Sequence, residues 1–236
     1  GVNTGAIHGF LKALNKIMED FKPKHIGIVF DAKGKNFRHK IYDQYKANRS
    51  SMPEDLAEQI PKLYQILKLM GFPPIIIDNV EADDVIGTLS KKFKKLSAVK
   101  IFSGDKDFAQ LVNKNVTLIN PMSSDIMDEK AVKKKFGVEP TNIIDYLALV
   151  GDKSDNIPGV PGVGSKTASR LINKYGDVES IIHQKDIIPG KVGESIKSFT
   201  EQLRLSKTLA TIKLDVELPL GLNDLVKHDS EKESLI

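Results

Sequence analysis

The chain has 236 residues, of which 40% are hydrophobic and 28% are charged. This length and apolar content predict one large domain, or one domain with a small addition, and they exclude wholesale disorder. Without Cys the chain has no disulfide scaffold, no thiol nucleophile and no Cys-ligated zinc or iron–sulfur site. No apolar run approaches the ~18 residues of a membrane span, and no signal peptide is recognisable. The net charge of +4 is a mild indication of a polyanionic partner.

Helical and extended patterns alternate along the first 127 residues. Short apolar strands between amphipathic helices predict an α/β fold, with a mostly parallel central sheet flanked by helices. The expected elements are a helix over 4–20, a strand over 24–30, a helix over 53–70, a strand over 74–77, a helix over 82–95, a strand over 99–102, a short helix over 106–111 and a strand over 116–119.

The character of the chain changes after residue 127, because helical patterns dominate from there. We expect helices at about 128–136, 140–150, 165–175, 177–183 and 190–210. The predicted organisation is therefore an α/β core over 1–127, a helical portion over 128–220 and a C-terminal tail over 221–236 without a clear pattern.

Acidic side chains follow several predicted strands at the point where each strand ends. Three clusters come after the strands at 24–30, 74–77 and 99–102, and a fourth precedes a glycine-rich loop. In an open α/β sheet, ligands bind beyond the carboxyl ends of the strands, so we expect the first three clusters to share one edge. The four clusters contain Asp31, Glu81, Asp83, Asp84, Asp105, Asp107, Asp152 and Asp155.

Each cluster taken alone has an ordinary explanation, because carboxylates also cap helices and form turns. Their joint placement favours a functional site, since so many like charges need compensation by cations. Oxygen ligands without His or Cys select Mg²⁺ or Mn²⁺ rather than zinc, and two such ions can hydrolyse a phosphodiester. Setting these eight aside leaves 23 of the 31 acidic residues against 35 basic ones, a balance of +12 that suits a polyanionic substrate.

Two segments have the composition of phosphate-binding sites. The basic segment 33–50 interleaves lysines and arginines with aromatic residues, which suits phosphates and unpaired bases; the alternative is a solvated loop whose tyrosines fill a gap in the core. The loop from Ile157, within 151–175, resembles a helix-hairpin-helix motif, in which glycine backbones and the next helix N-terminus hold phosphates. The alternative there is a tight turn between two helices.

These motifs together resemble the 5′-nuclease (5′→3′ exonuclease) domain of bacterial DNA polymerase I and, more broadly, the flap-endonuclease family. The resemblance is carried by FDAKG, FRH and YKANR within 30–49, EADD at 81–84, SGDKD at 103–107 and GDKSDNIPGVPGVGSKTA at 151–168. It covers nearly the whole chain in the order of the family.

The resemblance implies a PIN-like 5′-nuclease fold and a metal-dependent 5′→3′ exonuclease and structure-specific 5′-flap endonuclease. Such an enzyme hydrolyses DNA phosphodiester bonds and removes flaps and primers in replication and repair. The implied cofactors are two or more Mg²⁺ or Mn²⁺ ions, with K⁺ on the carbonyls of Val160 and Val163. The implied partner is duplex-containing DNA with a 5′ flap or 5′ end, and no membrane partner is implied. The implied location is the bacterial cytoplasm, at the nucleoid. The resemblance also implies that the protein is a monomer or is fused to a polymerase portion.

The family's functional residues transfer by position. The eight carboxylates match its metal cluster, with Asp84 and Asp152 acting through waters. Lys46 and Arg49 match basic residues of a helical arch that engage the scissile phosphate. The residues expected to contact DNA are Arg38, Tyr45, Lys46, Arg49, Gly159, Gly162, Gly164, Ser165, Lys166, Thr167 and Arg170.

One departure from the family pattern is serious. The family opens with a strand ending in an aspartate, of the kind LxDGSS, and nothing like it precedes Thr4. Because the chain begins with Gly1, we expect truncation. The alternative is a DNA-structure-binding module without catalysis. A second alternative is a related nuclease specific for RNA, against which the hairpin-like loop argues because it suits a DNA duplex.

Overall fold

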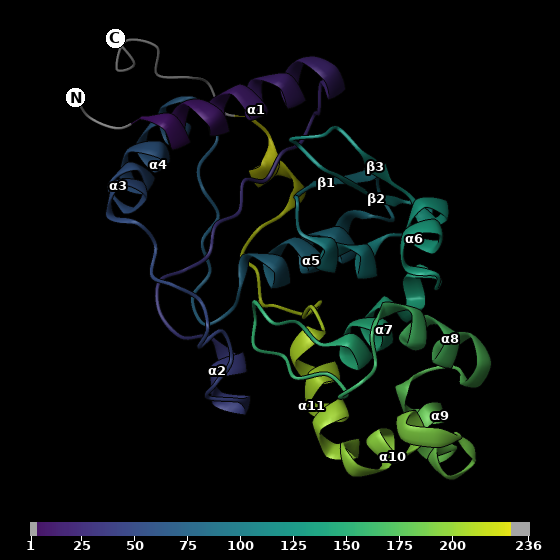
Figure 1. Ribbon diagram of the computed structural model, residues 1–236. Helices are drawn as coiled ribbons and strands as arrows, with labels where there is room; N and C mark the ends of the chain where they lie inside the picture. Colours follow the sequence, from purple (N-terminus) through teal and green to yellow (C-terminus); the bar gives the residue numbers. More distant parts are fainter. Residues whose placement is uncertain (1–3, 228–236) are drawn as a thin grey trace. The chain divides into compact units, whose positions relative to one another are not determined.

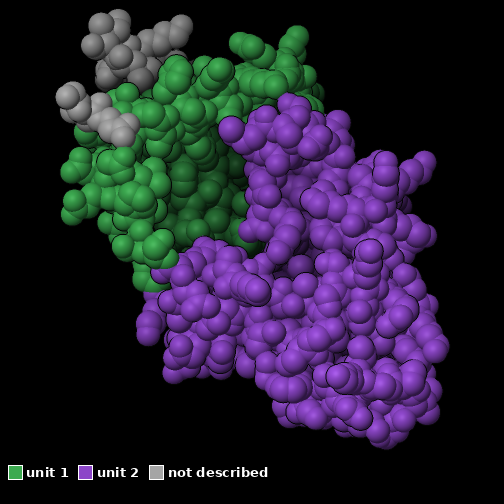
Figure 2. All heavy atoms as spheres, in the orientation of Figure 1, with its two compact units in different colours: residues 1–34, 50–86, 215–236 green, residues 35–49, 87–214 purple. Residues whose placement is uncertain are grey.

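A computed structural model describes residues 4–227 (Figure 1), so the end of the predicted tail, 228–236, lies outside the described residues. The chain divides into two compact units, coloured separately in Figure 2. Unit 1 comprises Gly1–Gly34, Ser50–Ile86 and Asp215–Ile236, and unit 2 comprises Lys35–Arg49 and Gly87–Leu214. Within the described part of the chain, no helix has the length and apolar character needed to cross a membrane.

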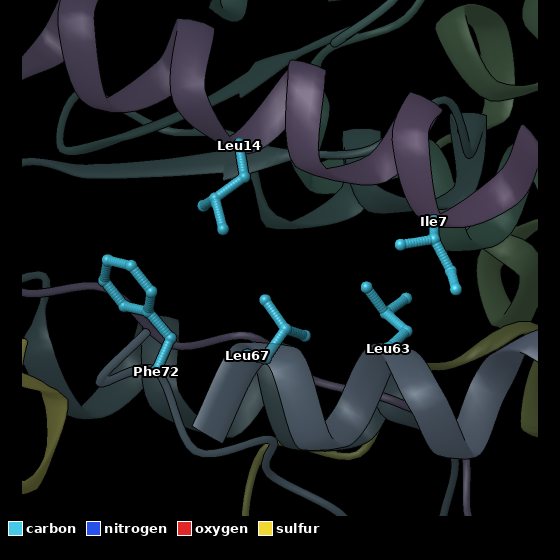
Figure 3. Close-up of a cluster of buried hydrophobic side chains, with 5 residues drawn as sticks. All are labelled: Ile7, Leu14, Leu63, Leu67 and Phe72. Carbon is cyan, nitrogen blue, oxygen red and sulfur yellow. The ribbon is translucent and has the colours of Figure 1, made fainter. Parts of the chain in front are cut away.

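The core of unit 1 lies between two helices, α1 (Gly5–Phe21) and α4 (Gln59–Leu69). Their apolar side chains recur at helical spacing and face one another across the interface in Figure 3. The buried cluster contains Ile7, Leu14, Leu63, Leu67 and Phe72. The helix predicted over 53–70 is divided, because a short α3 (Glu54–Ala57) precedes α4.

Two segments predicted as strands, 24–30 and 74–77, form only an isolated parallel bridge between Val29 and Ile75. Phe30 N–H donates to the Ile75 carbonyl at 3.0 Å, and Ile75 N–H donates to the Ile28 carbonyl at 2.8 Å. A longer ladder is limited by Pro73 and Pro74, which have no backbone N–H to donate. The parallel direction nevertheless places Asp31 after one of these paired segments. A short 3₁₀ helix η4 (Leu222–Leu225) then brings the Leu225 carbonyl to Ile26 N–H.

Unit 2 contains a three-stranded sheet in the order β1-β2-β3 among the described residues. α5 (Ala82–Phe93) leads into it from unit 1. β1 (Val99–Phe102) and β2 (Val116–Ile119) pair in parallel and are joined by the 3₁₀ helix η1 (Lys106–Leu111). These three elements have the predicted bounds. β3 (Ile126–Met127), which was not predicted, pairs antiparallel with β2.

The rest of unit 2 is mostly helical; the helices from residue 128 onward were predicted, whereas α2 was not. α7 is its central element, since it is buried along almost its whole length and packs against α8 and α11. The helix expected over 190–210 is interrupted at Phe199. Figure 1 shows the helices as α2 (Phe37–Ile41), α6 (Glu129–Phe136), α7 (Ile143–Val150), α8 (Ser165–Tyr175), α9 (Val178–His183), α10 (Gly190–Ser198) and α11 (Thr200–Ala210), with 3₁₀ helices η2 (Pro140–Asn142) and η3 (Lys185–Ile187) between them.

Candidate metal and nucleic-acid site

In unit 1, the predicted carboxylates gather at the N-terminus of α5. Ala82 N–H donates to Asp31 Oδ1 at 2.8 Å, and Glu81 N–H donates to Asp84 Oδ2 at 3.0 Å. Asp84 is fully buried, with an exposed fraction of 0%. These two carboxylates therefore satisfy two backbone amides at the start of α5, which is the kind of capping role that the sequence left open. The same contacts fix their positions.

Asp31 has a second neighbour in unit 1. Burial and the negative charge of Asp31 raise the pKa of Tyr64. The Tyr64 ring lies edge-on against Phe30, with ring centroids 4.7 Å apart. The Asp31 carboxylate thus influences Tyr64 and accepts a hydrogen bond at the N-terminus of α5.

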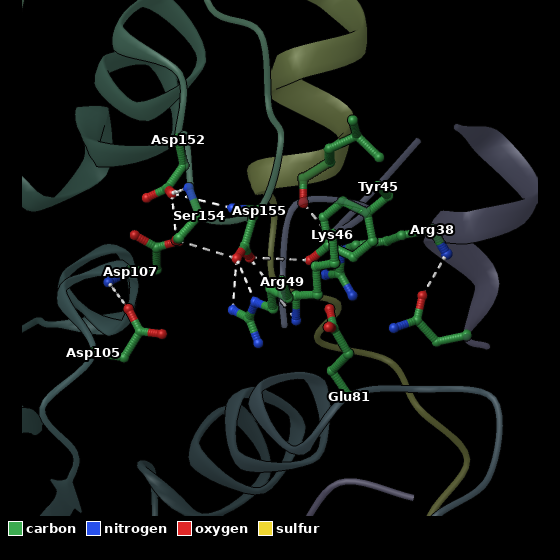
Figure 4. Close-up of polar contacts among 12 residues, drawn as sticks. Arg38, Tyr45, Lys46, Arg49, Glu81, Asp105, Asp107, Asp152, Ser154 and Asp155 are labelled. Atoms are coloured by element: carbon green, nitrogen blue, oxygen red, sulfur yellow. Dashed lines mark hydrogen bonds and ion pairs between the residues drawn. The ribbon is translucent and has the colours of Figure 1, made fainter. Parts of the chain in front are cut away.

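In unit 2, Asp105 and Asp107 follow β1 directly and lie side by side (Figure 4). Asp105 caps η1, because Asp107 N–H donates to Asp105 Oδ1 at 2.9 Å. Asp105 N–H itself donates to Ser103 Oγ at 3.0 Å. The SGDKD sequence therefore forms a tight turn that carries both carboxylates.

Asp107 is the least satisfied of these carboxylates. Its Oδ1 is buried and accepts no hydrogen bond from any residue of 4–227. Burial, followed by the negative charge of Asp105, raises the pKa of Asp107 to about 7. A buried acceptor without a hydrogen bond lowers the stability of the fold by about 1–3 kcal/mol. A cation is the partner that would stabilise the charged form of Asp107.

A second turn, which follows α7, supplies Asp152 and Asp155. Ser154 donates to Asp152 Oδ1 through both its N–H and its hydroxyl, at 2.8 and 2.6 Å. Lys106 Nζ lies 2.7 Å from Asp152 Oδ2. Burial tends to raise the pKa of Asp152, but the hydrogen bonds from Lys106 and Ser154 outweigh burial and lower that pKa to about 2. Asp152 is therefore ionised at neutral pH.

Basic residues of the segment 35–49 contact the other carboxylate of this turn, Asp155. Arg49 Nη2 lies 2.5 Å from Asp155 Oδ1, and Lys46 Nζ lies 3.8 Å from Asp155 Oδ2. The Lys46 backbone N–H donates to the Asp155 carbonyl at 2.9 Å, and Lys46 has a left-handed backbone with φ of 57°. Figure 4 shows both cations converging on Asp155. The segment that carries Lys46 and Arg49 is thus attached to the carboxylate turn.

The structure brings four of the predicted carboxylates together in unit 2 through their neighbours. Lys106, between Asp105 and Asp107 in the sequence, pairs with Asp152 and so joins the two turns. Among residues 4–227, however, no three acidic or histidine side chains are arranged to hold one metal ion. The eight carboxylates therefore remain a prediction as metal ligands, and in unit 2 two of them have cationic partners.

Two residues expected to contact DNA, Arg38 and Tyr45, lie in the interior of unit 2. Their exposed fractions are 2% and 4%. The Arg38 guanidinium donates to the carbonyls of Leu209 and Thr211. The Tyr45 ring packs edge-on against His39, and its hydroxyl donates to Asp155 Oδ2 at 3.4 Å. In this structure both side chains therefore hold the segment in place and are not presented to phosphates or bases.

The glycines of the hairpin-like loop fall into two groups. Gly159 is buried, its φ is +64°, and a Cβ there would lie 2.6 Å from the Gly151 nitrogen. Its N–H donates to Ser206 Oγ at 3.1 Å, so Gly159 is engaged in packing rather than offered to a phosphate. Gly162 and Gly164 are exposed, and nothing lies within 4 Å of the Cβ position at either one. These two can be approached closely by a ligand.

The helix after this loop, α8, begins in a way that suits an anion. Its N-cap is Gly164, without a side-chain cap and without an acidic residue in the first turn. Lys166 and Arg170 are exposed one turn apart. By contrast, α6 and α9 are capped by Asp128 and Asp177. The first turn of α8 is therefore the place in this motif where amides and positive charge could meet a phosphate.

Sequence reasoning missed two residues of this region, Lys106 and Ser206. Lys106 had a usable signal, because a lysine between two candidate ligands in the sequence Asp-Lys-Asp is placed to pair with a third carboxylate. Ser206 gave no signal, since its role depends on Gly159, which is 47 positions away in the chain.

Nearly the whole chain matches two adjoining domain families. Residues 1–137 match the family described as "5′-3′ exonuclease, N-terminal resolvase-like domain", and residues 138–233 match "5′-3′ exonuclease, C-terminal SAM fold". A protein of Aquifex aeolicus named 5′-3′ exonuclease is 45% identical over 95% of this chain and 77% of its own length. DNA polymerase I of Pseudomonas aeruginosa is 44% identical over 100% of this chain but only 27% of its own length.

A solved structure has the same fold. The bacteriophage T5 D15 flap endonuclease, in a complex with DNA and metal ions, superimposes with a TM-score of 0.74. The match covers 88% of this chain and 80% of the T5 chain at 24% identity. At this identity the likeness concerns the fold, a mixed α/β core with a small sheet and a helical C-terminal part.

Proposed function

Because this chain belongs to the 5′-3′ exonuclease family of nucleases, we propose that it hydrolyses DNA phosphodiester bonds at 5′ ends and 5′ flaps. The observation that carries the proposal is the attachment of Lys46 and Arg49 to Asp155 in unit 2. It brings the cations suited to a phosphate to the carboxylates suited to a divalent ion.

The cofactor in this proposal is two or more Mg²⁺ or Mn²⁺ ions. The chain fits such ions, because its candidate ligands are carboxylates and Asp107 Oδ1 is buried without a partner in residues 4–227. When bound, divalent ions lower the pKa of a water and stabilise negative charge on a leaving oxygen. The proposed ligands are Asp31, Glu81, Asp83, Asp84, Asp105, Asp107, Asp152 and Asp155.

Lys46 and Arg49 have a separate role in the proposal. They would exchange Asp155 for the scissile phosphate and stabilise the charge that develops on it in the transition state. Arg49 can do so with two parallel hydrogen bonds, whereas Lys46 acts as a point charge. Neither residue needs to act as a nucleophile.

The loop before α8 would hold the duplex part of the substrate. Gly162, Gly164 and the first turn of α8 would face the phosphate backbone, with Lys166 and Arg170 adding charge. Ser165 and Thr167 belong to that first turn. K⁺ on the carbonyls of Val160 and Val163 completes this part of the proposal. Contacts of this kind involve no base, so little sequence preference is expected.

The proposed partner is therefore duplex-containing DNA with a 5′ flap or a 5′ end. In this proposal the protein acts as a monomer or as one part of a longer polymerase. Its place of action would be the cytoplasm, at the nucleoid.

The decisive experiment is cleavage of a labelled 5′-flap substrate by the full-length protein, with and without Mg²⁺. We expect cleavage of a DNA flap only when Mg²⁺ is present. We also expect the binding constant K to fall as salt rises, with a slope of log K against log salt concentration of about −0.9 for each phosphate contacted. Binding without any cleavage would support a DNA-structure-binding module instead. Cleavage of an RNA flap but not of the matched DNA flap would support an RNA-specific nuclease.

A further inference from the structure

Arg38 forms an internal connection that the proposed reaction does not use directly. Its side chain is 2% exposed, yet it comes from a basic segment that otherwise faces solvent at Lys33, Lys35 and Lys40. Its Nε donates to the Leu209 carbonyl at 3.0 Å, and its Nη2 donates to the Thr211 carbonyl at 2.7 Å. These carbonyls lie at the C-terminus of α11, where helix carbonyls have no partner within the helix.

The guanidinium is suited to this position and an ammonium is not. A planar guanidinium donates to two acceptors at a fixed spacing, whereas a lysine offers one mobile point charge. Burying a charge is unfavourable unless its donors are satisfied, so the contact holds only when both carbonyls are in place. Arg38 thereby fixes the start of α2 relative to the end of α11.

A chain of short contacts leads from Arg38 to Lys46. Asn36 caps α2 by accepting from Arg38 N–H at 2.9 Å. Tyr42 N–H donates to the Arg38 carbonyl, and Tyr45 N–H donates to the Tyr42 carbonyl. Lys46 N–H then donates to the Asp155 carbonyl. Each step is a backbone hydrogen bond or a cap, and Tyr45 adjoins Lys46 in the chain, so contacts connect Arg38 to Lys46 without a break.

The same helix also touches the hairpin-like loop. Ser206, on α11, is 0% exposed, and its Oγ accepts from Gly159 N–H at 3.1 Å. Less than one helical turn separates Ser206 from Leu209, which meets Arg38. One rigid helix therefore contacts both the segment that carries Lys46 and the loop that precedes α8.

We propose that α11 sets the spacing between these two segments, and that Arg38 and Ser206 are positioning residues that fix where the strand is cut relative to the bound duplex. The proposal rests on the proposed function, because it assumes that both segments contact DNA. It assigns to Arg38 a role through the protein backbone instead of a contact with phosphate. All of the contacts involved lie within unit 2.

The test compares Arg38→Lys and Ser206→Ala with Val132→Ala, a control that removes a fully buried side chain from α6, away from this path. Products of a 5′-flap substrate are resolved at single nucleotides under single-turnover conditions. We expect Arg38→Lys to spread cleavage over neighbouring phosphodiesters and to slow it about tenfold or more, since a displacement of about 1 Å costs up to 10²-fold. Ser206→Ala should spread the cut site in the same way, and Val132→Ala should leave it unchanged.

Salt dependence separates this role from a phosphate contact. If Arg38 touched a phosphate, Arg38→Met would lower the slope of log K against log salt by about 0.9; we expect an unchanged slope. A lower slope, or a cut site as sharp as in the control variant, would overturn the proposal.

Amide hydrogen exchange gives a readout that does not depend on cleavage. Arg38→Lys should accelerate exchange at Lys46, and Ser206→Ala should accelerate it at Gly159, while Val132→Ala changes neither. Unchanged protection at Lys46 in Arg38→Lys would contradict the coupling even in a protein that cleaves normally. A wild-type protein that cleaves no flap would instead refute the proposed function and leave this exchange experiment to judge the coupling.

Discussion

Backbone amides hold carboxylates in both units, but in unit 2 two carboxylates also pair with cationic side chains. In unit 1, Asp31 and Asp84 accept hydrogen bonds from backbone amides at the start of α5. In unit 2, Asp152 and Asp155 pair with the side chains of Lys106 and Arg49, and Asp107 Oδ1 has no partner within 4–227.

This difference indicates which carboxylates belong to the scaffold and which can change partners. A backbone amide is a fixed part of its helix, so a carboxylate that it holds stays in place. A lysine or arginine side chain can leave, and another cation or a phosphate can then take over one member of the pair. We therefore expect substitutions at Asp152 and Asp155, which pair with cationic side chains, to affect activity before stability, and substitutions at Asp84 to affect stability before activity.

The largest expected effect is on cleavage by Asp105→Ala in unit 2. Removing this carboxylate should lower the single-turnover rate by about 10³-fold or more, because it removes charge stabilisation at the reacting centre. Binding of the flap substrate, measured by fluorescence anisotropy, should change little. Asp125→Ala removes an exposed aspartate from the same unit and serves as the control. Equal loss of activity in both variants would remove Asp105 from the site.

The next largest effect is expected for Lys46→Ala. Loss of its charge should slow single-turnover cleavage by about 10²-fold, with a smaller change in affinity for the duplex. Lys40→Ala removes an exposed lysine from the same segment and should leave the rate unchanged. If Lys46→Ala reduced only the affinity, its assignment to the chemical step would be wrong.

Asp107→Asn tests the unpartnered carboxylate of unit 2 through the pH dependence of the free energy of unfolding. The folded-state pKa of Asp107 is about 7, above its ordinary value, so the folded protein binds more protons than the unfolded chain between about pH 4 and pH 7. The free energy of unfolding of the wild type should therefore fall as pH rises through that window.

Asp107→Asn should lack this fall and should be more stable than the wild type by about 1–3 kcal/mol at pH 8. Urea unfolding from pH 4 to pH 8, in buffer containing a chelator, measures the difference between the two proteins. A difference that does not change with pH would show that Asp107 is not protonated in the folded state.

The smallest effect is expected in unit 1. Asp84→Ala should lower the free energy of unfolding by about 0.5–2 kcal/mol, the usual cost of a lost helix cap. Asp78→Ala, at an exposed aspartate just before α5, should be nearly neutral. Thermal unfolding of both variants measures this contrast, and equal melting temperatures would contradict a capping role for Asp84.

Local signals predicted much of the fold correctly. The bounds of β1, η1 and β2 follow from short apolar runs, and α6 and α9 begin at Asp residues that cap them. The segments around Val29 and Ile75 were wrongly predicted as strands, because their apolar pattern does not reveal that Pro73 and Pro74 limit the hydrogen bonds between them. β3 was missed because a strand of two residues has no detectable periodicity.

The sequence by itself determined which residues carry charge and which elements carry those residues, since both depend on neighbours within a few positions. Only the tertiary structure decided that Arg38 turns inward to carbonyls more than 170 positions away, that Arg49 pairs with Asp155, and that Asp107 Oδ1 is buried. The reason is physical: burial and long-range hydrogen bonds depend on which surfaces the fold brings together, and no local spacing of residue types encodes that.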